Sequence, residues 1–166
     1  SHLPAAACHV VPLNDGHAHY DYPAEAAFEI RADDPSAYER AAAFLNLRNA
    51  DVISLQHEYG IFGGDAGGHV LGLLRNLRAP VHTTLHTVLA KPSPAQRRVM
   101  NDIIHLSARL AVMTERGRTL LSDVHGVSPA RIDVIPHGIP DMPLSDPGSR
   151  TPQLGLAGRR MLLTFG

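Results

Sequence analysis

The sequence predicts an α/β protein with a Rossmann-like, three-layer αβα architecture and a mainly parallel sheet. Short β-rich runs alternate with helical patterns along most of the 166 residues, which is typical of βαβ units. Three predicted strands also run into a histidine: DVISLQ before His57, VHTTL before His86 and RIDVIP before His137. Because open α/β sheets bind ligands where their parallel strands end, this recurrence predicts a ligand-binding crevice.

The predicted strands are short apolar runs bounded by turn residues, at 8–13, 25–30, 51–56, 81–86, 109–113 and 131–135. A first helix is predicted over about 35–48, because Asp34 can cap it and Pro35 suits its first position. An apolar stripe after a glycine-rich stretch predicts a second helix over about 65–77.

Two further helices are predicted from residues that typically cap the start of a helix. Ser93 and Gln96 form a capping-box pattern ahead of an amphipathic run. Thr114 can cap a helix that opens with Glu115, whose charge suits the helix dipole, and that ends at Gly126.

Beyond His137 the sequence changes to a stretch rich in proline and glycine, which predicts a linker over 139–158. The last residues, MLLTFG, have the pattern of one more buried strand. The expected organisation is therefore a Rossmann-like domain over 1–138, the linker, and a strand within 159–166.

Composition excludes several classes of protein. Hydrophobic residues make up 44% of the chain and the formal net charge is -1, so no basic field favours nucleic acid or anionic lipid. The single cysteine, Cys8, rules out an internal disulfide framework. No apolar run approaches the roughly 20 residues of a membrane-spanning helix. We therefore expect a soluble, cytoplasmic protein with a small or neutral ligand.

Eleven histidines raise the alternative of a metal-dependent hydrolase. The tightest group is DGHAHYD, where His17 and His19 would share one face of an extended segment, close to Asp15 and Asp21. Barrel enzymes that use such a pair typically need about 250 residues, however, and Gly16 and Pro23 suggest a polar loop. Solvated loop histidines are the simpler interpretation.

The stretch QHEYGIFGGDAGGH follows the third predicted strand. Gln56, His57 and Glu58 would emerge at the strand end, and Gly63 and Gly64 would let backbone amides approach a ligand. A tight turn in which the glycines only satisfy backbone geometry explains the pattern equally well.

Other strand ends supply further candidates. His86 and Thr87 close the next strand, where a neutral imidazole can bond to a substrate hydroxyl or simply be satisfied by nearby backbone. Thr114 and Glu115 follow the strand after it, and a plain helix cap explains them well. His137 and Gly138 follow the last of these strands.

Four segments, taken in order, resemble the retaining glycosyltransferases of the GT-B fold, in particular bacterial family 4. They are ADVISLQHEYGIFGGDAG (50–67), PVHTTLHTVL (80–89), ARLAVMTERGRTLL (108–121) and GVSPARIDVIPHGIP (126–140). The last is similar to the segment with which such enzymes leave their first domain, with His137 in place of an asparagine.

The resemblance implies that the chain is the N-terminal, acceptor-side lobe of an enzyme that moves a sugar from a nucleotide sugar to a hydroxyl acceptor, without metal or other cofactor. His86 matches a strand-end histidine that contacts the donor sugar or holds the reacting groups. The remaining matches would line the cleft: Gln56, His57, Glu58, Gly63, Gly64, Thr87, Thr114, Glu115, His137 and Gly138.

The chain also departs from the family pattern. No segment before Pro4 matches the usual opening strand, and RRMLLTFG resembles only the first strand of the donor-binding domain. We therefore expect the isolated chain to be inactive and to self-associate through exposed sheet edges, unless 161–165 fills the gap. A carbohydrate-binding or interaction module without catalysis is the alternative.

Overall fold

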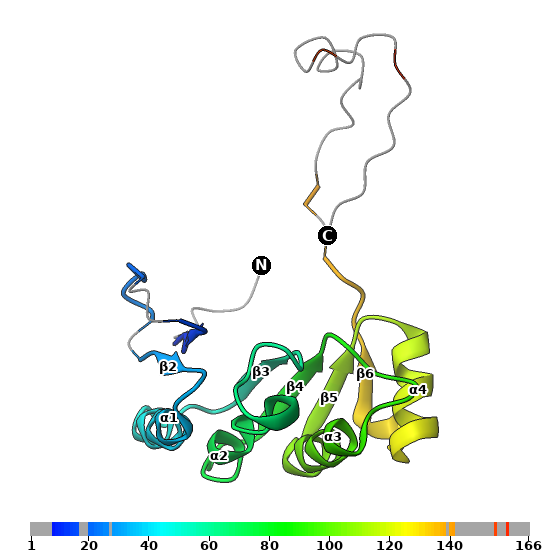
Figure 1. Ribbon diagram of the computed structural model, residues 1–166, viewed down its shortest axis with the longest axis horizontal. Coiled ribbons are helices and arrows are strands. Elements are labelled where there is room, and N and C mark those ends of the chain that lie inside the picture. Colours follow the sequence, from blue (N-terminus) through cyan, green and yellow to red (C-terminus); the bar gives the residue numbers. More distant parts are fainter. Residues whose placement is uncertain are drawn as a thin grey trace. The chain divides into compact units, whose positions relative to one another are not determined.

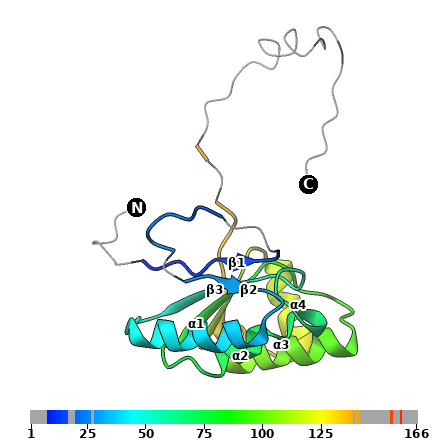
Figure 2. The same cartoon turned by 60° about the vertical axis from the view of Figure 1, so that its left-hand side comes forward.

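A computed structural model describes residues 8–16, 20–26, 28–138, 140–141, 155 and 159. The chain divides into two compact units, Ser1–Pro136 and His137–Gly166, and the described helices and strands lie in the first. In order these are β1 (Leu13–Asn14), β2 (Ile30–Arg31), α1 (Pro35–Leu47), β3 (Ile53–His57), η1 (Asp65–Gly67), α2 (Val70–Leu74), β4 (Val81–Leu85), α3 (Pro94–Leu106), β5 (Arg109–Val112), α4 (Glu115–His125), η2 (Pro129–Arg131) and β6 (Ile132–Val134). Figure 1 labels β2 to β6 and α1 to α4, and β1 is labelled in Figure 2.

The strands form two separate parallel ladders. The larger has the order β3-β4-β5-β6, and β1 pairs only with β2. Helices connect successive parallel strands, so the predicted Rossmann-like α/β fold is confirmed. Strands occur at or beside all six predicted places, but β1 and β2 are only two residues long, and each overlaps its predicted run at one residue, Leu13 and Ile30.

The described helices pack against one face of the larger sheet (Figure 2). On that face the register aligns Leu55 with Thr83, Thr83 with Leu110 and Leu110 with Ile132. Two apolar clusters join these strands to the helices, one around Leu55 and one around Leu110. The helices therefore bury this side of the sheet.

The opposite face is polar. Its register aligns Ser54 with His82, Gln56 with Thr84 and His82 with Arg109. Each of these five side chains is half-buried or exposed. No helix among the described residues packs against this face, which we call the polar face. The predicted three-layer αβα arrangement is therefore corrected for the described residues, which form one helical layer on one face of the sheet.

The predicted helix starts are confirmed in detail. The Asp34 carboxylate accepts from the Ser36 amide at 3.0 Å. Ser93 and Gln96 form the reciprocal capping box, at 3.2 and 2.9 Å. Such a cap contributes about 1 kcal/mol because it satisfies amides that have no partner within the helix.

The predicted helix over 65–77 is instead two short pieces, η1 and α2. Ala66 and Gly67 have φ values of 52° and 76°, in the left-handed region, so they interrupt the helical backbone. The apolar stripe survives, because Val70, Leu73 and Leu74 are all buried.

None of the described helices combines the length and apolar character needed to cross a bilayer. His17 and His19, and the predicted strand at 161–165, lie outside the described residues.

Candidate functional site

The ends of β3 and β4 bring four of the predicted site residues together. The strands run parallel with His57 aligned to Leu85, and the His86 amide continues the ladder by donating to the His57 carbonyl at 3.0 Å. Side chains that follow one strand can therefore bond to those that follow the other. We call Gln56, Glu58, His86 and Thr87 the strand-end group.

Two side-chain hydrogen bonds hold the strand-end group. His86 Nε2 lies 2.9 Å from Gln56 Oε1, and the Thr87 hydroxyl donates to Glu58 Oε2 at 2.6 Å. The other Glu58 oxygen accepts from the Tyr59 amide at 2.9 Å. Both carboxylate oxygens are thus engaged, which ties the loop after β4 to the end of β3.

Part of the strand-end group is exposed to solvent. Gln56 and His86 are exposed, whereas Glu58 and Thr87 are half-buried. The exposed pair offers amide and imidazole groups, which can bond to hydroxyls without carrying a permanent charge. This chemistry suits a hydroxyl-bearing ligand.

His57, although it was predicted to line the cleft, points the other way. Its ring is fully buried, stacks on Phe62 at 5.7 Å between centroids, and meets the edge of Tyr59 at 5.2 Å. Side chains alternate along a strand, so Gln56 and His57 face opposite sides of the sheet. His57 therefore supports the site from within the core.

The buried His57 ring should make stability depend on pH. Burial lowers the pKa of His57 to about 4, outweighing the opposite effect of Glu58, whereas the unfolded chain keeps about 6.5. Between these values only the unfolded chain binds the proton. The contribution of His57 to the free energy of unfolding is therefore fully present above about pH 6.5. It is lost as the pH drops towards 4, by up to about 3 kcal/mol.

Urea unfolding of the wild type and His57→Leu between pH 4 and 7.5 checks this expectation. The difference between the two curves isolates His57 from the other titrating groups. Equal pH dependence in both proteins would contradict the burial of a neutral ring.

The glycine-rich stretch is built around close backbone contacts. A Cβ added to Gly63 would lie 1.8 Å from the Ala32 carbonyl oxygen, and one added to Gly64 would lie 2.5 Å from the His69 ring. Gly64 also has a φ of 81°, which disfavours any other residue. These contacts favour the interpretation of the two glycines as a tight turn.

Hydrogen bonds around the Ala32 carbonyl hold this turn in place. The oxygen accepts from the Tyr38 hydroxyl at 3.1 Å and from His69 Nδ1 at 3.2 Å, and the Gly63 amide donates to the Tyr38 hydroxyl at 3.2 Å. Because a carbonyl can only accept, His69 must carry its proton on Nδ1 in this contact. His69 was not among the residues predicted from the sequence, because its contact with Ala32 spans 37 residues.

Thr114 and Glu115 follow β5, the next strand along the same sheet edge. The Thr114 hydroxyl accepts from the Gly117 amide at 3.0 Å, and Glu115 pairs with Arg118 at 2.5 Å. These contacts match the helix-cap interpretation, although both residues remain exposed. His137 and Gly138 belong to the second unit and are described as exposed.

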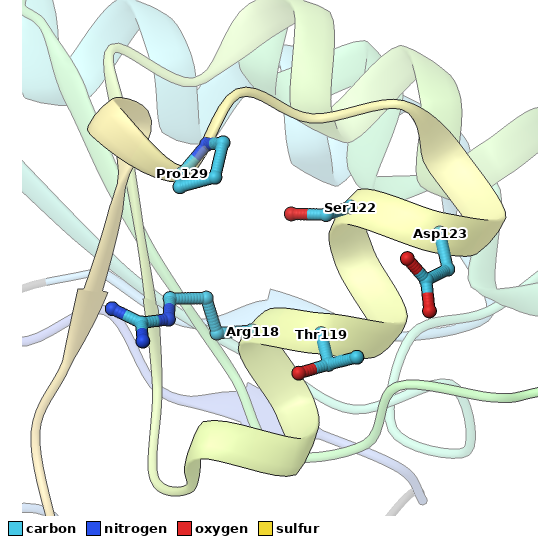
Figure 3. A pocket seen from close by; sticks show the side chains of 5 residues that line it. All are labelled: Arg118, Thr119, Ser122, Asp123 and Pro129. Carbon is cyan, nitrogen blue, oxygen red and sulfur yellow. The ribbon is translucent and has the colours of Figure 1, made fainter.

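A separate hollow lies beside α4, as Figure 3 shows. Its five lining residues lie between 118 and 129, so none belongs to the strand-end group: Arg118, Thr119, Ser122, Asp123 and Pro129. In the part of the chain that the structure describes, no three His, Cys, Asp or Glu side chains are grouped to hold a metal ion.

Comparison with known proteins gives one family. The family model described as Glycosyltransferase Family 4 matches residues 4–141, which include all of the described helices and strands. A search of curated proteins finds no match. Since the match spans most of the 166 residues, the chain belongs to glycosyltransferase family 4.

Proposed function

We propose that this chain is the acceptor-side lobe of a retaining GT-B glycosyltransferase of the hexosyltransferase type. The complete enzyme moves a sugar from a nucleotide sugar to a hydroxyl acceptor. The acceptor oxygen forms a bond to the anomeric carbon as the bond from that carbon to the diphosphate breaks. The acceptor proton passes to an oxygen of the departing diphosphate, which is released as nucleoside diphosphate.

The observation that carries the proposal is the strand-end group in a family 4 domain. Gln56 and His86 are exposed, hydrogen-bonded at 2.9 Å and placed where parallel strands end. His86 is the proposed contact to the reacting sugar and hydroxyl, while Gln56, Glu58 and Thr87 shape the acceptor side. Thr114 and Glu115 are proposed to extend the cleft along the same edge of the sheet, and Gly63 and Gly64 to hold its acceptor wall.

The donor is proposed to bind a second, C-terminal lobe. Transfer then needs groups from both lobes, because the departing diphosphate must be stabilised while the acceptor is held in place. No metal ion is assigned a role in this scheme.

The test compares the isolated 166 residues with a polypeptide that carries both lobes. Each is incubated with a panel of uridine and guanosine diphosphate sugars and alcohol acceptors, and nucleoside diphosphate release and product anomeric configuration are measured. We expect retained configuration from the two-lobe protein and no turnover from the isolated chain.

Turnover by the isolated chain, or inverted product from the two-lobe protein, would contradict the proposal. Saturable acceptor binding by both proteins, without turnover by either, would instead identify a carbohydrate-binding module.

A further inference from the structure

We propose that Glu58 sets the charge preference of the strand-end group, so that the site selects hydroxyl acceptors that are neutral or positively charged over acceptors that carry a carboxylate or a phosphate. This inference rests on the proposed function and adds to it the chemical class of the acceptor.

The first step is the state of the Glu58 carboxylate. Its two oxygens accept from the Tyr59 amide at 2.9 Å and from the Thr87 hydroxyl at 2.6 Å. Both donors are neutral, so these hydrogen bonds hold the carboxylate without cancelling the negative charge that a glutamate carries at neutral pH. In the part of the chain that the structure describes, Glu58 forms no ion pair with a lysine or an arginine.

The second step is the charge of the groups around Glu58. The other members of the strand-end group bring amide, hydroxyl and imidazole groups, which carry no permanent charge. At the next strand end the situation differs, because Glu115 has a cationic partner in Arg118. Glu58 therefore gives the end of β3 and β4 a negative character.

The third step is the effect of this charge on a bound acceptor. Glu58 is half-buried and bonds to Thr87, the residue next to His86, so its charge lies beside the exposed surface of the strand-end group. Charges at a partly buried site are screened less than charges in bulk water. Because both carboxylate oxygens are held by hydrogen bonds, turning the group away from an incoming anion would break them. Repulsion should lower the affinity for an anionic acceptor by about tenfold.

The test uses three sugars of one shape and different charge: methyl glucoside, which is neutral, methyl glucuronide, which is negative, and methyl glucosaminide, which is positive at pH 7. In the two-lobe polypeptide, kcat/KM for the neutral and positive sugars should exceed that for the glucuronide by about tenfold.

Glu58→Gln removes the charge and keeps the polar contacts. The new amide oxygen can accept from Tyr59, and the amide nitrogen can donate to the Thr87 hydroxyl, which can also accept. The ratio of kcat/KM between methyl glucoside and methyl glucuronide should therefore fall by about tenfold in this variant. Urea unfolding checks that the variant keeps the fold.

Asp51→Asn is the matched control. Asp51 is exposed and precedes β3 at its opposite end, seven residues before Glu58, which corresponds to about 20 Å along an extended chain. This variant removes the same charge beyond the screening length of about 8 Å at physiological ionic strength, so the ratio should not change. Equal changes in the two variants, or an unchanged ratio in Glu58→Gln, would overturn the role of Glu58 while leaving the transferase function intact.

Binding to the 166-residue chain separates the inference from the proposed function. Nitrogen-15 NMR of the backbone amides, titrated with the same three sugars, should show about tenfold weaker binding of the glucuronide to the wild type but not to Glu58→Gln. This pattern without turnover by the two-lobe polypeptide would contradict the transferase function and support the charge preference. Turnover with equal affinity for the neutral and negative sugars would overturn the inference alone. No turnover with any acceptor and no binding of any of the three sugars would contradict both.

Discussion

Replacing His86 by alanine in a polypeptide that carries both lobes should lower kcat by about 10²-fold or more. The proposed function gives this side chain a contact to the reacting groups, and a single well-placed catalytic or stabilising group typically contributes at least that much. The fold should survive, because the His86 side chain is exposed. The hydrogen bond from the His86 backbone amide to the His57 carbonyl does not depend on the ring. Steady-state kinetics and urea unfolding of the variant check both parts.

His82→Ala is a matched control for this experiment. His82 lies on the polar face of β4, four residues before His86, which follows the end of that strand. It is half-buried and its contact is a 3.8 Å approach to Asp133. We expect wild-type kinetics from this variant. Equal losses in the two alanine variants would indicate a general effect on the sheet and remove His86 from the mechanism.

Replacing Gly63 by alanine should lower the free energy of unfolding by about 3 kcal/mol. The new methyl group would meet the Ala32 carbonyl oxygen at 1.8 Å and His69 Nδ1 at 2.7 Å, distances that no atoms can keep without a backbone shift. Such a shift would also disturb the Tyr38 and His69 bonds to the same carbonyl. Urea unfolding followed by circular dichroism measures the loss.

Gly60→Ala is the control in the same loop. A Cβ at Gly60 has no heavy atom within 4 Å, and its φ does not lie in the left-handed region. This substitution should be close to neutral or slightly stabilising, because alanine restricts the unfolded chain. If the two variants were equally stable, the close approach at Gly63 would not be a constraint in solution.

Local patterns predicted the parts of the fold that depend on neighbouring residues. The Asp34, Ser93 and Thr114 caps could be recognised because each bonds to an amide two or three positions along the chain. The pairing of Gln56 with His86 was not itself predicted. The sequence did predict that both residues lie at strand ends, because parallel strands end at one edge of a sheet.

The direction of the His57 side chain could have been predicted from alternation. Ile53, Leu55 and His57 share one side of β3, and the two aliphatic residues mark the core side. The contacts of His69 and Gly63 with Ala32 could not be predicted, because they join segments about 30 residues apart through a turn whose geometry no local pattern specifies.

The division of the strands into two ladders also implies unequal local stability. β4 and β5 are paired on both sides, whereas β1 and β2 share a ladder of only two residues each. Segments with few ladder bonds open locally at a lower free-energy cost than a sheet interior does. The region around β1 and β2 can therefore fluctuate while β3 and β4 stay paired, so the geometry of the strand-end group does not depend on the least stable part of the domain.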